Sequence, residues 1–318
     1  MSRFPDRRYF ARAAHETGFR AGPLETVFRL AHLLGELAAD HGGELSLRGG
    51  TALNLLHLDV PRLSVDVDLD FVGSADAEEA RRRRPELLAE IELLARAIGY
   101  EVVQERPSYA MGHLRLRYRD ASGLASFLKL DVNFLDRVPV LPTERRPLRH
   151  PFGDDLAAID VQTLALDELA AGKLIALARR ALARDLFDAA MVATLPGLDV
   201  ARMRTALVVR GASYPPPSPA DYSAEVVERV RPAGWRSEVL ALCRRPVPVG
   251  LHEARAQAAE LLRRATELGP AHRAFLELLG RGELRPDVLD EEDLRERIAV
   301  NPGLLWRLRA GADALEER

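Results

Sequence analysis

Apolar residues recur along the first part of the chain with the periods of helices and strands. From Pro23 to Asp40 they fall at helical spacing, which predicts an amphipathic helix. A strand is expected over Glu44–Arg48, and a short helix should follow over Thr51–His57. Pro61 then interrupts the pattern before an acidic strand that begins at Ser64.

A long helix and three strands are expected next. Asp76 is suited to cap a helix that runs to Ile98 and carries an arginine run at residues 81–84. Alternating apolar residues predict strands over Tyr100–Arg106, His113–Arg119 and Leu124–Phe134. This order of elements predicts an α/β (α+β) core over residues 1–160.

The second half of the chain carries helical patterns almost throughout. Helices are predicted over residues 163–182, 184–195, 198–209, 222–231, 252–268, 270–280, 290–299 and 301–316. The proline-rich segment 213–219 cannot be helical. We therefore expect a helical domain over residues 161–318, with two sub-bundles that separate at this segment.

Composition narrows the class of protein. The 318 residues carry a formal net charge of -3, so a surface for nucleic acid has to be local. The single cysteine, Cys243, excludes an internal disulfide and fits a reducing compartment. No stretch approaches the roughly 20 apolar residues of a membrane span, and the N-terminus lacks the apolar core of a signal peptide. We expect a cytoplasmic protein with no membrane partner.

Carboxylates gather on one face of the strand that begins at Ser64. Asp66 and Asp68 alternate with valine, so their side chains point the same way. Their Cα atoms then lie about 7 Å apart, which suits metal ions separated by about 4 Å. Two aspartates on one strand face repel each other unless a cation lies between them. A metal site is predicted, with a solvated edge face as the alternative; Asp70 continues the face and is the expected bystander.

A glycine pair precedes the acidic strand. The turn Gly49-Gly50-Thr51 enters a helix, where unpaired backbone N–H groups attract anions. Glycine pairs are common in ordinary turns, so this motif alone is weak. Next to two carboxylates it predicts a phosphate cradle beside a metal site, which is the arrangement that a nucleoside triphosphate needs.

Only two of the 45 basic residues are lysines, Lys129 and Lys173. In so arginine-rich a chain a remaining lysine suggests a need for a compact ammonium group, with chance as the alternative. Lys129, Asp131 and Asn133 share one strand face. Asp131 is therefore a candidate third carboxylate on a neighbouring strand, and a surface salt bridge is the alternative.

Lys173 belongs to the predicted helical region. It forms one helical stripe with Arg180, and Asp185 and Asp188 follow one turn apart on the next helix. Two interpretations stay open. Lys173 either reaches phosphate oxygens across a cleft between domains or takes part only in an interdomain contact.

Together these motifs resemble the AbiEii-type nucleotidyltransferase toxins. The motifs that carry the resemblance are Gly49-Gly50-Thr51-Ala52-Leu53, Arg62-x-Ser64-x-Asp66-x-Asp68-Leu69, Lys173-Leu-x-Ala-Leu-x-x-Arg180 and Arg184-Asp185-Leu-Phe-Asp188. These toxins are similar to the MenT toxins of mycobacteria and belong to the polymerase-β-like nucleotidyltransferase superfamily. The resemblance covers residues 25–195 and implies a core with a mixed sheet, followed by an all-helical C-terminal region.

The resemblance also implies roles for residues. The expected nucleotide-binding residues are Gly49, Gly50, Thr51, Ser64, Lys129 and Lys173. Mg²⁺, with Mn²⁺ as the alternative, is expected on Asp66, Asp68 and Asp131. The expected catalytic residues are Asp66, Asp68, Asp131, Lys173 and Asp188, with Asp185 as the alternative to Asp188.

The expected function is transfer of a nucleoside monophosphate from an NTP to an acceptor, with tRNA favoured over other RNA or a protein hydroxyl. The resemblance implies the toxin of a type IV-like toxin–antitoxin pair, so a cognate antitoxin is an expected partner. Arginines at 81–84, 145–146 and 179–180 either bind a phosphate backbone or form solvated helix faces.

Two other functions stay open at this point. The protein is either a non-catalytic module that binds a nucleotide or an antitoxin, or a haloacid-dehalogenase-type phosphatase with Asp66-Val-Asp68 as its nucleophile loop. That loop normally ends in a turn with Gly or Thr, whereas Leu69-Asp70-Phe71 follows here.

Overall fold

The computed structural model describes residues 4–104, 108 and 110–316. The chain divides into two units, each made of segments that are separate in the sequence. Unit 1 comprises residues 1–137, 143–163 and 239–248, and unit 2 comprises residues 138–142, 164–238 and 249–318. The predicted acidic strand and glycine turn belong to unit 1, and Lys173 belongs to unit 2.

Unit 1 is built on a sheet that has seven strands in the described part of the chain. They are β1 (Leu45–Leu47), β2 (Asp66–Phe71), β3 (Glu101–Gln104), β4 (Met111–Arg119), β5 (Ala125–Asn133), β6 (Glu144–Pro147) and β7 (Asp160–Thr163). Their order in space is β3-β4-β5-β2-β1-β7-β6. The pairs β2–β5 and β1–β7 are parallel and the others are antiparallel, which confirms the expected mixed sheet.

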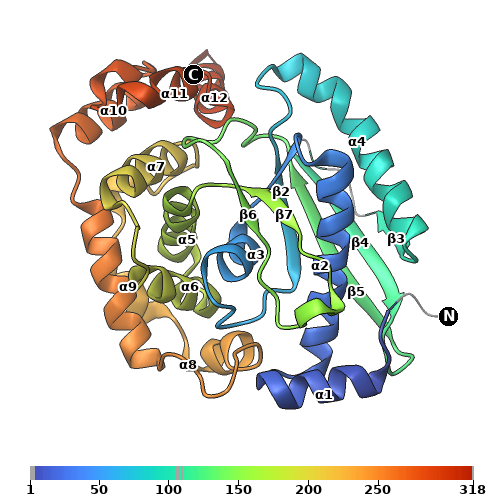
Figure 1. The fold of residues 1–318 in the computed structure, drawn as a ribbon. Coiled ribbons are helices and arrows are strands. Elements are labelled where there is room, and N and C mark those ends of the chain that lie inside the picture. Colours follow the sequence, from blue (N-terminus) through green and yellow to red (C-terminus); the bar gives the residue numbers. More distant parts are fainter. Residues whose placement is uncertain (1–3, 105–107, 109, 317–318) are drawn as a thin grey trace. The chain divides into compact units, whose positions relative to one another are not determined.

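Unit 1 also contains helices that pack on the sheet or on one another. They are α1 (Arg7–Thr17), α2 (Ala21–His41), α3 (Gly49–Ala52), which continues as a π-helical turn over Leu53–His57, and α4 (Ala77–Ala97). Alternate residues of β4 and β5 are buried, among them Leu114, Leu116, Leu128, Leu130 and Val132. α2 and α4 contact each other beside these strands (Figure 1). The opposite face of β4 and β5 carries polar side chains and is more exposed.

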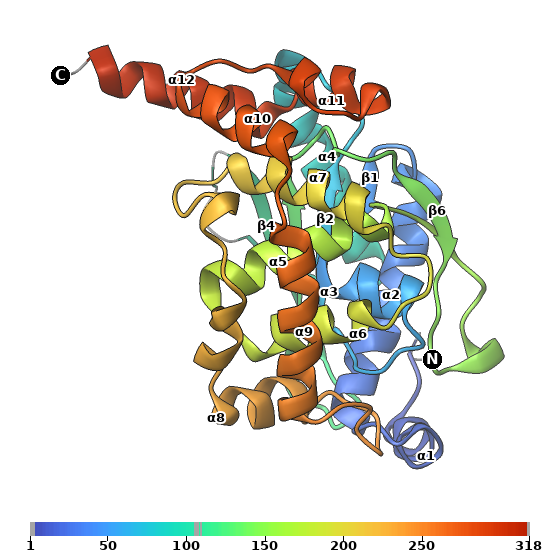
Figure 2. The same ribbon diagram turned by 90° about the vertical axis from the view of Figure 1, so that its left-hand side faces the viewer.

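Every element that the structure describes in unit 2 is helical, which confirms the expected all-helical C-terminal region. The α-helices are α5 (Leu166–Arg180), α6 (Ala183–Ala193), α7 (Val200–Ala212), α8 (Pro232–Gly234), α9 (Leu251–Thr266), α10 (Pro270–Gly280), α11 (Arg295–Ala299) and α12 (Pro302–Glu316). α5 packs on α6 and α7, and α9 packs on α6 (Figure 2). Among the described helices none is both long and apolar enough to cross a membrane.

Several predicted element boundaries are wrong. The helix expected from Thr163 begins at Leu166, because residues 160–163 form β7 and the Thr163 hydroxyl donates to the Leu47 carbonyl oxygen over 2.8 Å. The helix expected over 222–231 is a shorter 3-10 helix, Ala224–Arg229. The helix expected over 290–299 is divided into a 3-10 turn, Glu292–Leu294, and α11. Of the strand expected over 100–106, residues 105–106 lie outside the described residues.

Candidate active site

The carboxylates predicted from the sequence lie on two adjacent strands of unit 1. The parallel register of β2 and β5 places Asp66 beside Lys129, Asp68 beside Asp131 and Asp70 beside Asn133. Side chains alternate along a strand, so all of these residues belong to the same face of the sheet. The structure therefore brings Asp66, Asp68 and Asp131 together.

Asp131 is held by two neighbours. The ammonium nitrogen of Lys129 lies 2.7 Å from its Oδ2 atom, and Nδ1 of His113 lies 2.8 Å from its Oδ1 atom. The hydrogen bond to Asp131 raises the pKa of Lys129, and the charges of Asp68 and Asp66 add to this, against the lowering effect of burial. Lys129 thus stays charged and offsets part of the negative potential of the carboxylate face.

The donor chemistry of this face suits a hard cation. Carboxylate oxygens are the ligands that Mg²⁺ prefers in proteins, and Asp66 and Asp68 present theirs from one strand face. Within residues 4–104, 108 and 110–316, no group of three or more His, Cys, Asp or Glu side chains is arranged to hold a metal ion. Since Lys129 lies on Oδ2 of Asp131, a metal ion at this face would compete with the lysine for that oxygen.

Asp70 is fully buried and is bound by polar side chains on both sides. Nε of Arg48 lies 3.0 Å from its Oδ1 atom, and Nδ2 of Asn133 donates to the same oxygen over 3.0 Å. These contacts join the strand to its two neighbours and give Asp70 a structural role. That Asp70 is a bystander of the chemistry stays a prediction.

The predicted glycine turn lies against Asp68. Gly49 has a φ angle of +72°, and a Cβ atom at this position would lie 2.8 Å from Oδ2 of Asp68. Only glycine satisfies both the backbone angle and the close approach. Gly50 follows in α3 and is buried, and Arg48 at the N-cap position makes no side-chain capping hydrogen bond. The start of α3 is therefore next to the carboxylates.

Thr51 connects this turn to β2. Its side chain is fully buried, and its hydroxyl donates to the backbone carbonyl oxygen of Asp66 over 2.5 Å. Ser64 is also buried and lies two residues before β2. The Thr51 hydroxyl thus holds α3 against the start of the acidic strand, and the phosphate contacts expected of Thr51 and Ser64 stay predictions.

Lys173, Asp185 and Asp188 meet within unit 2. Nζ of Lys173, on α5, lies 2.7 Å from Oδ2 of Asp188 and 3.6 Å from Oδ1 of Asp185, both on α6. Arg180 donates to both oxygens of Asp185, over 2.6 and 2.9 Å. The two carboxylates are fully buried, so each needs these cations. The phosphate contact expected of Lys173 stays a prediction.

A pocket of about 420 Å³ adjoins the acidic strand in unit 1. Its lining residues are Pro23, Thr26, Val65, Asp66, Arg115, Phe127, Lys129 and Leu242. The Arg115 guanidinium lies over the Phe127 ring, 4.2 Å from the ring centroid. Phe127 is 41% exposed. The sequence alone did not single out Arg115 or Phe127.

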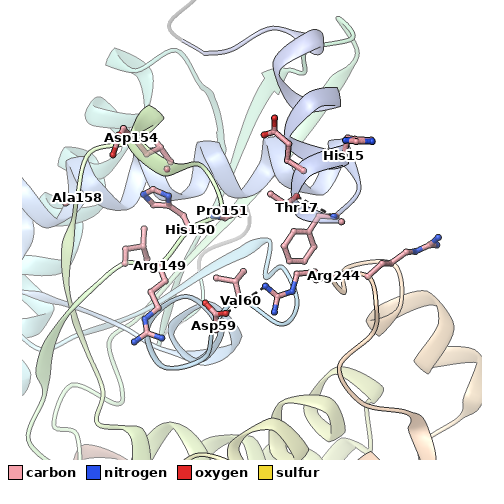
Figure 3. A pocket seen from close by; sticks show the side chains of 17 residues that line it. His15, Thr17, Asp59, Val60, Arg149, His150, Pro151, Asp154, Ala158 and Arg244 are labelled. Atoms are coloured by element: carbon pink, nitrogen blue, oxygen red, sulfur yellow. Dashed lines mark hydrogen bonds and ion pairs between the residues drawn. The ribbon is translucent and has the colours of Figure 1, made fainter.

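A larger pocket of unit 1, of about 810 Å³, contains none of the predicted site residues (Figure 3). Its charged lining is balanced, with Arg149, Arg244 and Arg245 against Glu16, Asp59 and Asp154. Burial lowers the pKa of His150, which also lines it, so this side chain adds little positive charge near neutral pH. The balanced charge does not favour a phosphate ligand.

His113 is a site residue that sequence reasoning missed. The hairpin of β4 and β5 pairs His113 with Asp131 and Arg119 with Ala125. The turn between the strands was predicted at Asp120–Gly123, and counting residue pairs outward from it sets His113 against Leu130, one residue short of the observed partner. The loop between the paired residues also includes Leu124, which was predicted to belong to the strand, so the predicted turn alone did not give the register that brings His113 to Asp131.

A family model described as the nucleotidyl transferase AbiEii toxin of a type IV toxin–antitoxin system matches residues 32–296. The chain belongs to the AbiEii family. The resemblance predicted from the sequence is confirmed, and so is membership of a family of nucleotidyltransferase toxins.

Solved structures support the fold of this AbiEii protein. MenT4, a nucleotidyltransferase toxin from Mycobacterium tuberculosis H37Rv, is 20% identical over 93% of this chain and 99% of its own, with a TM-score of 0.66. At this identity the likeness shows a shared fold. JHP933 from Helicobacter pylori is 17% identical over 78% of this chain and 94% of its own, but its TM-score of 0.48 is too low to carry an argument. No curated protein matches the chain.

Proposed function

We propose that this AbiEii protein is a metal-dependent nucleotidyltransferase that transfers a nucleoside monophosphate from an NTP to a hydroxyl of RNA, with tRNA as the favoured acceptor. It would act in the cytoplasm as the toxin of a toxin–antitoxin pair. The observation that supports this best is the register of β2 and β5, which sets Asp68 beside Asp131 while Gly49 lies against Asp68.

The carboxylate face supplies the groups that this reaction needs. Asp66, Asp68 and Asp131 would hold Mg²⁺, or Mn²⁺ in its place. Such ions, when bound, neutralise phosphate charge and lower the pKa of an attacking hydroxyl. His113 fixes the orientation of the Asp131 carboxylate through its Nδ1 atom. Asp131 would then accept the proton of the acceptor hydroxyl.

Two further groups of the chain would bind the triphosphate. The backbone at Gly49 and Gly50, at the start of α3, would donate to its oxygens beside Asp68. Lys173 is proposed as a cationic contact for the same group, a role that comes from the family resemblance. Its pairing with Asp188 would hold the ammonium group in a fixed orientation.

The test incubates the protein with each α-labelled NTP in turn, Mg²⁺ and total tRNA. We expect the RNA to be labelled by wild-type protein and not by the isosteric variants Asp66→Asn and Asp68→Asn. Asp160→Asn is a matched control, since it makes the same change at an exposed carboxylate of the same sheet, and it should label like wild type. Equal labelling by wild type and Asp68→Asn would refute the metal-site assignment.

The same assay addresses the competing functions. A non-catalytic binding module would bind NTP with Mg²⁺ and label neither RNA nor protein. A phosphatase would release inorganic phosphate from simple esters, and membership of a nucleotidyltransferase family argues against this outcome. Labelling of protein in place of RNA would keep the enzyme class and change the acceptor.

A further inference from the structure

We propose that the 420 Å³ pocket beside Asp66 receives the terminal nucleobase of the RNA acceptor, and that arginines of β4 bind the phosphates behind it. This rests on the proposed function, because it assigns the acceptor side of the same site. The arginines are Arg115, Arg117 and Arg119, and we call them the β4 arginine row. Its side of the sheet is the one that carries the carboxylates.

The position of the pocket relative to the glycine turn assigns it to the acceptor. Gly49 lies against Asp68, whereas the pocket is lined by Asp66 and Lys129, one residue pair further along the same strand face. In phosphoryl transfer the attacking and leaving oxygens lie roughly in line on opposite sides of phosphorus. With pyrophosphate leaving towards the glycine turn, the attacking hydroxyl has to arrive from the Asp66 side.

The lining of the pocket suits a base. Phe127 is 41% exposed, and the guanidinium of Arg115 lies 4.2 Å from its ring centroid. Aromatic rings and guanidinium planes are the surfaces on which proteins stack unpaired RNA bases. The volume of about 420 Å³ falls in the range of small-ligand pockets, about 300–1,000 Å³. A single nucleoside matches this size and chemistry.

The β4 arginine row extends from the pocket on the exposed face of the strand. Arg115, Arg117 and Arg119 are all exposed, and the residues between them are buried. Arg117 pairs with Glu101 at 3.2 Å, with both side chains about half exposed or more. Exposed ion pairs of this kind contribute little, so a phosphate can replace the carboxylate at small cost. The row supplies the local basic surface that a chain of net charge -3 needs to bind RNA.

The test measures binding without catalysis. A 5′-fluorescein-labelled RNA of twelve nucleotides ending in CCA is titrated with the protein in the absence of NTP, and its anisotropy is followed. We expect Phe127→Ala to weaken binding about tenfold, since a stacked base is lost. Leu124→Ala is the matched control, because it removes another exposed apolar side chain, 67% exposed, just before β5. It should bind like wild type.

A second measurement reports on the phosphate contacts. For single strands, the slope of log affinity against log salt falls by about 0.7 for each phosphate contact that is lost. Arg117→Gln should therefore lower the slope by this amount, a change that a purely structural role does not produce. Phe127→Leu keeps an apolar side chain and should lose part of the affinity, which separates stacking from a folding defect.

The outcomes that would overturn this inference are distinct from failure of the proposed function. Unchanged RNA affinity in Phe127→Ala, or no binding of the RNA by wild type, would refute it even if tRNA is labelled. If Phe127→Ala has a higher KM for NTP than wild type and the same affinity for RNA, the pocket would be assigned to the base of the NTP instead. A further outcome is that wild type binds the RNA but transfers no nucleotide, while Phe127→Ala binds the RNA more weakly. This would support the assignment of the pocket and contradict the proposed nucleotidyltransferase activity.

Discussion

At the scale of single residues, the candidate site depends on contacts that leave little freedom. Gly49 combines a positive φ angle with a close approach to Asp68, so the turn and the acidic strand fit only with glycine there. Lys129 and His113 each bind one oxygen of Asp131. The carboxylate that would act on the acceptor hydroxyl is thus oriented before any substrate arrives.

Gly49→Ala should abolish most activity. The substitution costs about 1–2 kcal/mol in the left-handed backbone region, and its Cβ atom displaces the Asp68 carboxylate. A displacement near 1 Å lowers a rate by about a hundredfold. Gly123→Ala is the control, since Gly123 has a φ angle of +82° and nothing lies near its Cβ position. Initial rates of RNA labelling compare the two, and equal rates would contradict the role of this contact.

Lys129→Met should strengthen metal binding. A metal ion bound by Asp131 would compete with Lys129 for its Oδ2 atom, so removing the ammonium should tighten Mn²⁺ binding about tenfold, after allowance for solvent screening. Binding is followed by the loss of the free Mn²⁺ signal in electron paramagnetic resonance. Arg117→Met removes a similarly exposed cation from the neighbouring strand and should change little. Weaker binding by Lys129→Met would show that the lysine is not a competitor.

At the scale of elements, the candidate site includes short helical segments that are held in place by contacts of their side chains. α3 has four residues and continues as a π-helical turn that ends at His57. The Thr51 hydroxyl ties α3 to β2. Neither segment is long enough to be stable alone, so this part of the site depends on burial and on its contacts with the sheet.

The π-helical turn should make stability depend on pH. Burial, followed by the positive charge of Arg146, lowers the pKa of His57 from 6.5 to about 4. The unfolded chain therefore binds a proton between these values that the folded chain does not, and stability is lost as pH falls from 6.5 to 4. Between pH 7 and 5 we expect His57 to account for about 2 kcal/mol of the loss in unfolding free energy.

Urea unfolding of wild type and His57→Gln at pH 7 and pH 5 measures this contribution. The variant should show a smaller loss between the two pH values. The same loss in both proteins would mean that His57 is not held neutral in the folded state.

The sequence predicted the elements with strong periodicity and missed the short polar ones. α2, α4 and α5 have apolar stripes, and β2, β4 and β5 alternate, so their existence was predicted. β6 consists of Glu144–Pro147, with only two arginines between, and its side chains point partly to solvent. β7 has four residues, of which only Thr163 was assigned to an element, the helix predicted after it. Such strands are specified by pairing with neighbours, which periodicity does not reveal.

At the scale of the whole molecule, family and class could be predicted because they depend on a few motifs. Asp66, Asp68 and Gly49 lie close in sequence, so local reasoning reached them. His113, Arg115 and Phe127 needed the register of the hairpin, which a linear search for motifs did not use. The sequence also gave no sign that the segment 239–248 returns to unit 1. There the backbone of Cys243 forms an isolated antiparallel β-bridge with that of Arg62.

The most direct test of nucleotidyl transfer compares two labels in one reaction. The protein, Mg²⁺ and total tRNA are incubated with an NTP labelled at the α-phosphate, and in parallel with the same NTP labelled at the γ-phosphate. The account predicts that the α-label enters the RNA and that the γ-label leaves as pyrophosphate, with neither event in Asp68→Asn. Entry of the γ-label into RNA, or its release as inorganic phosphate without α-label entering RNA, would contradict the account.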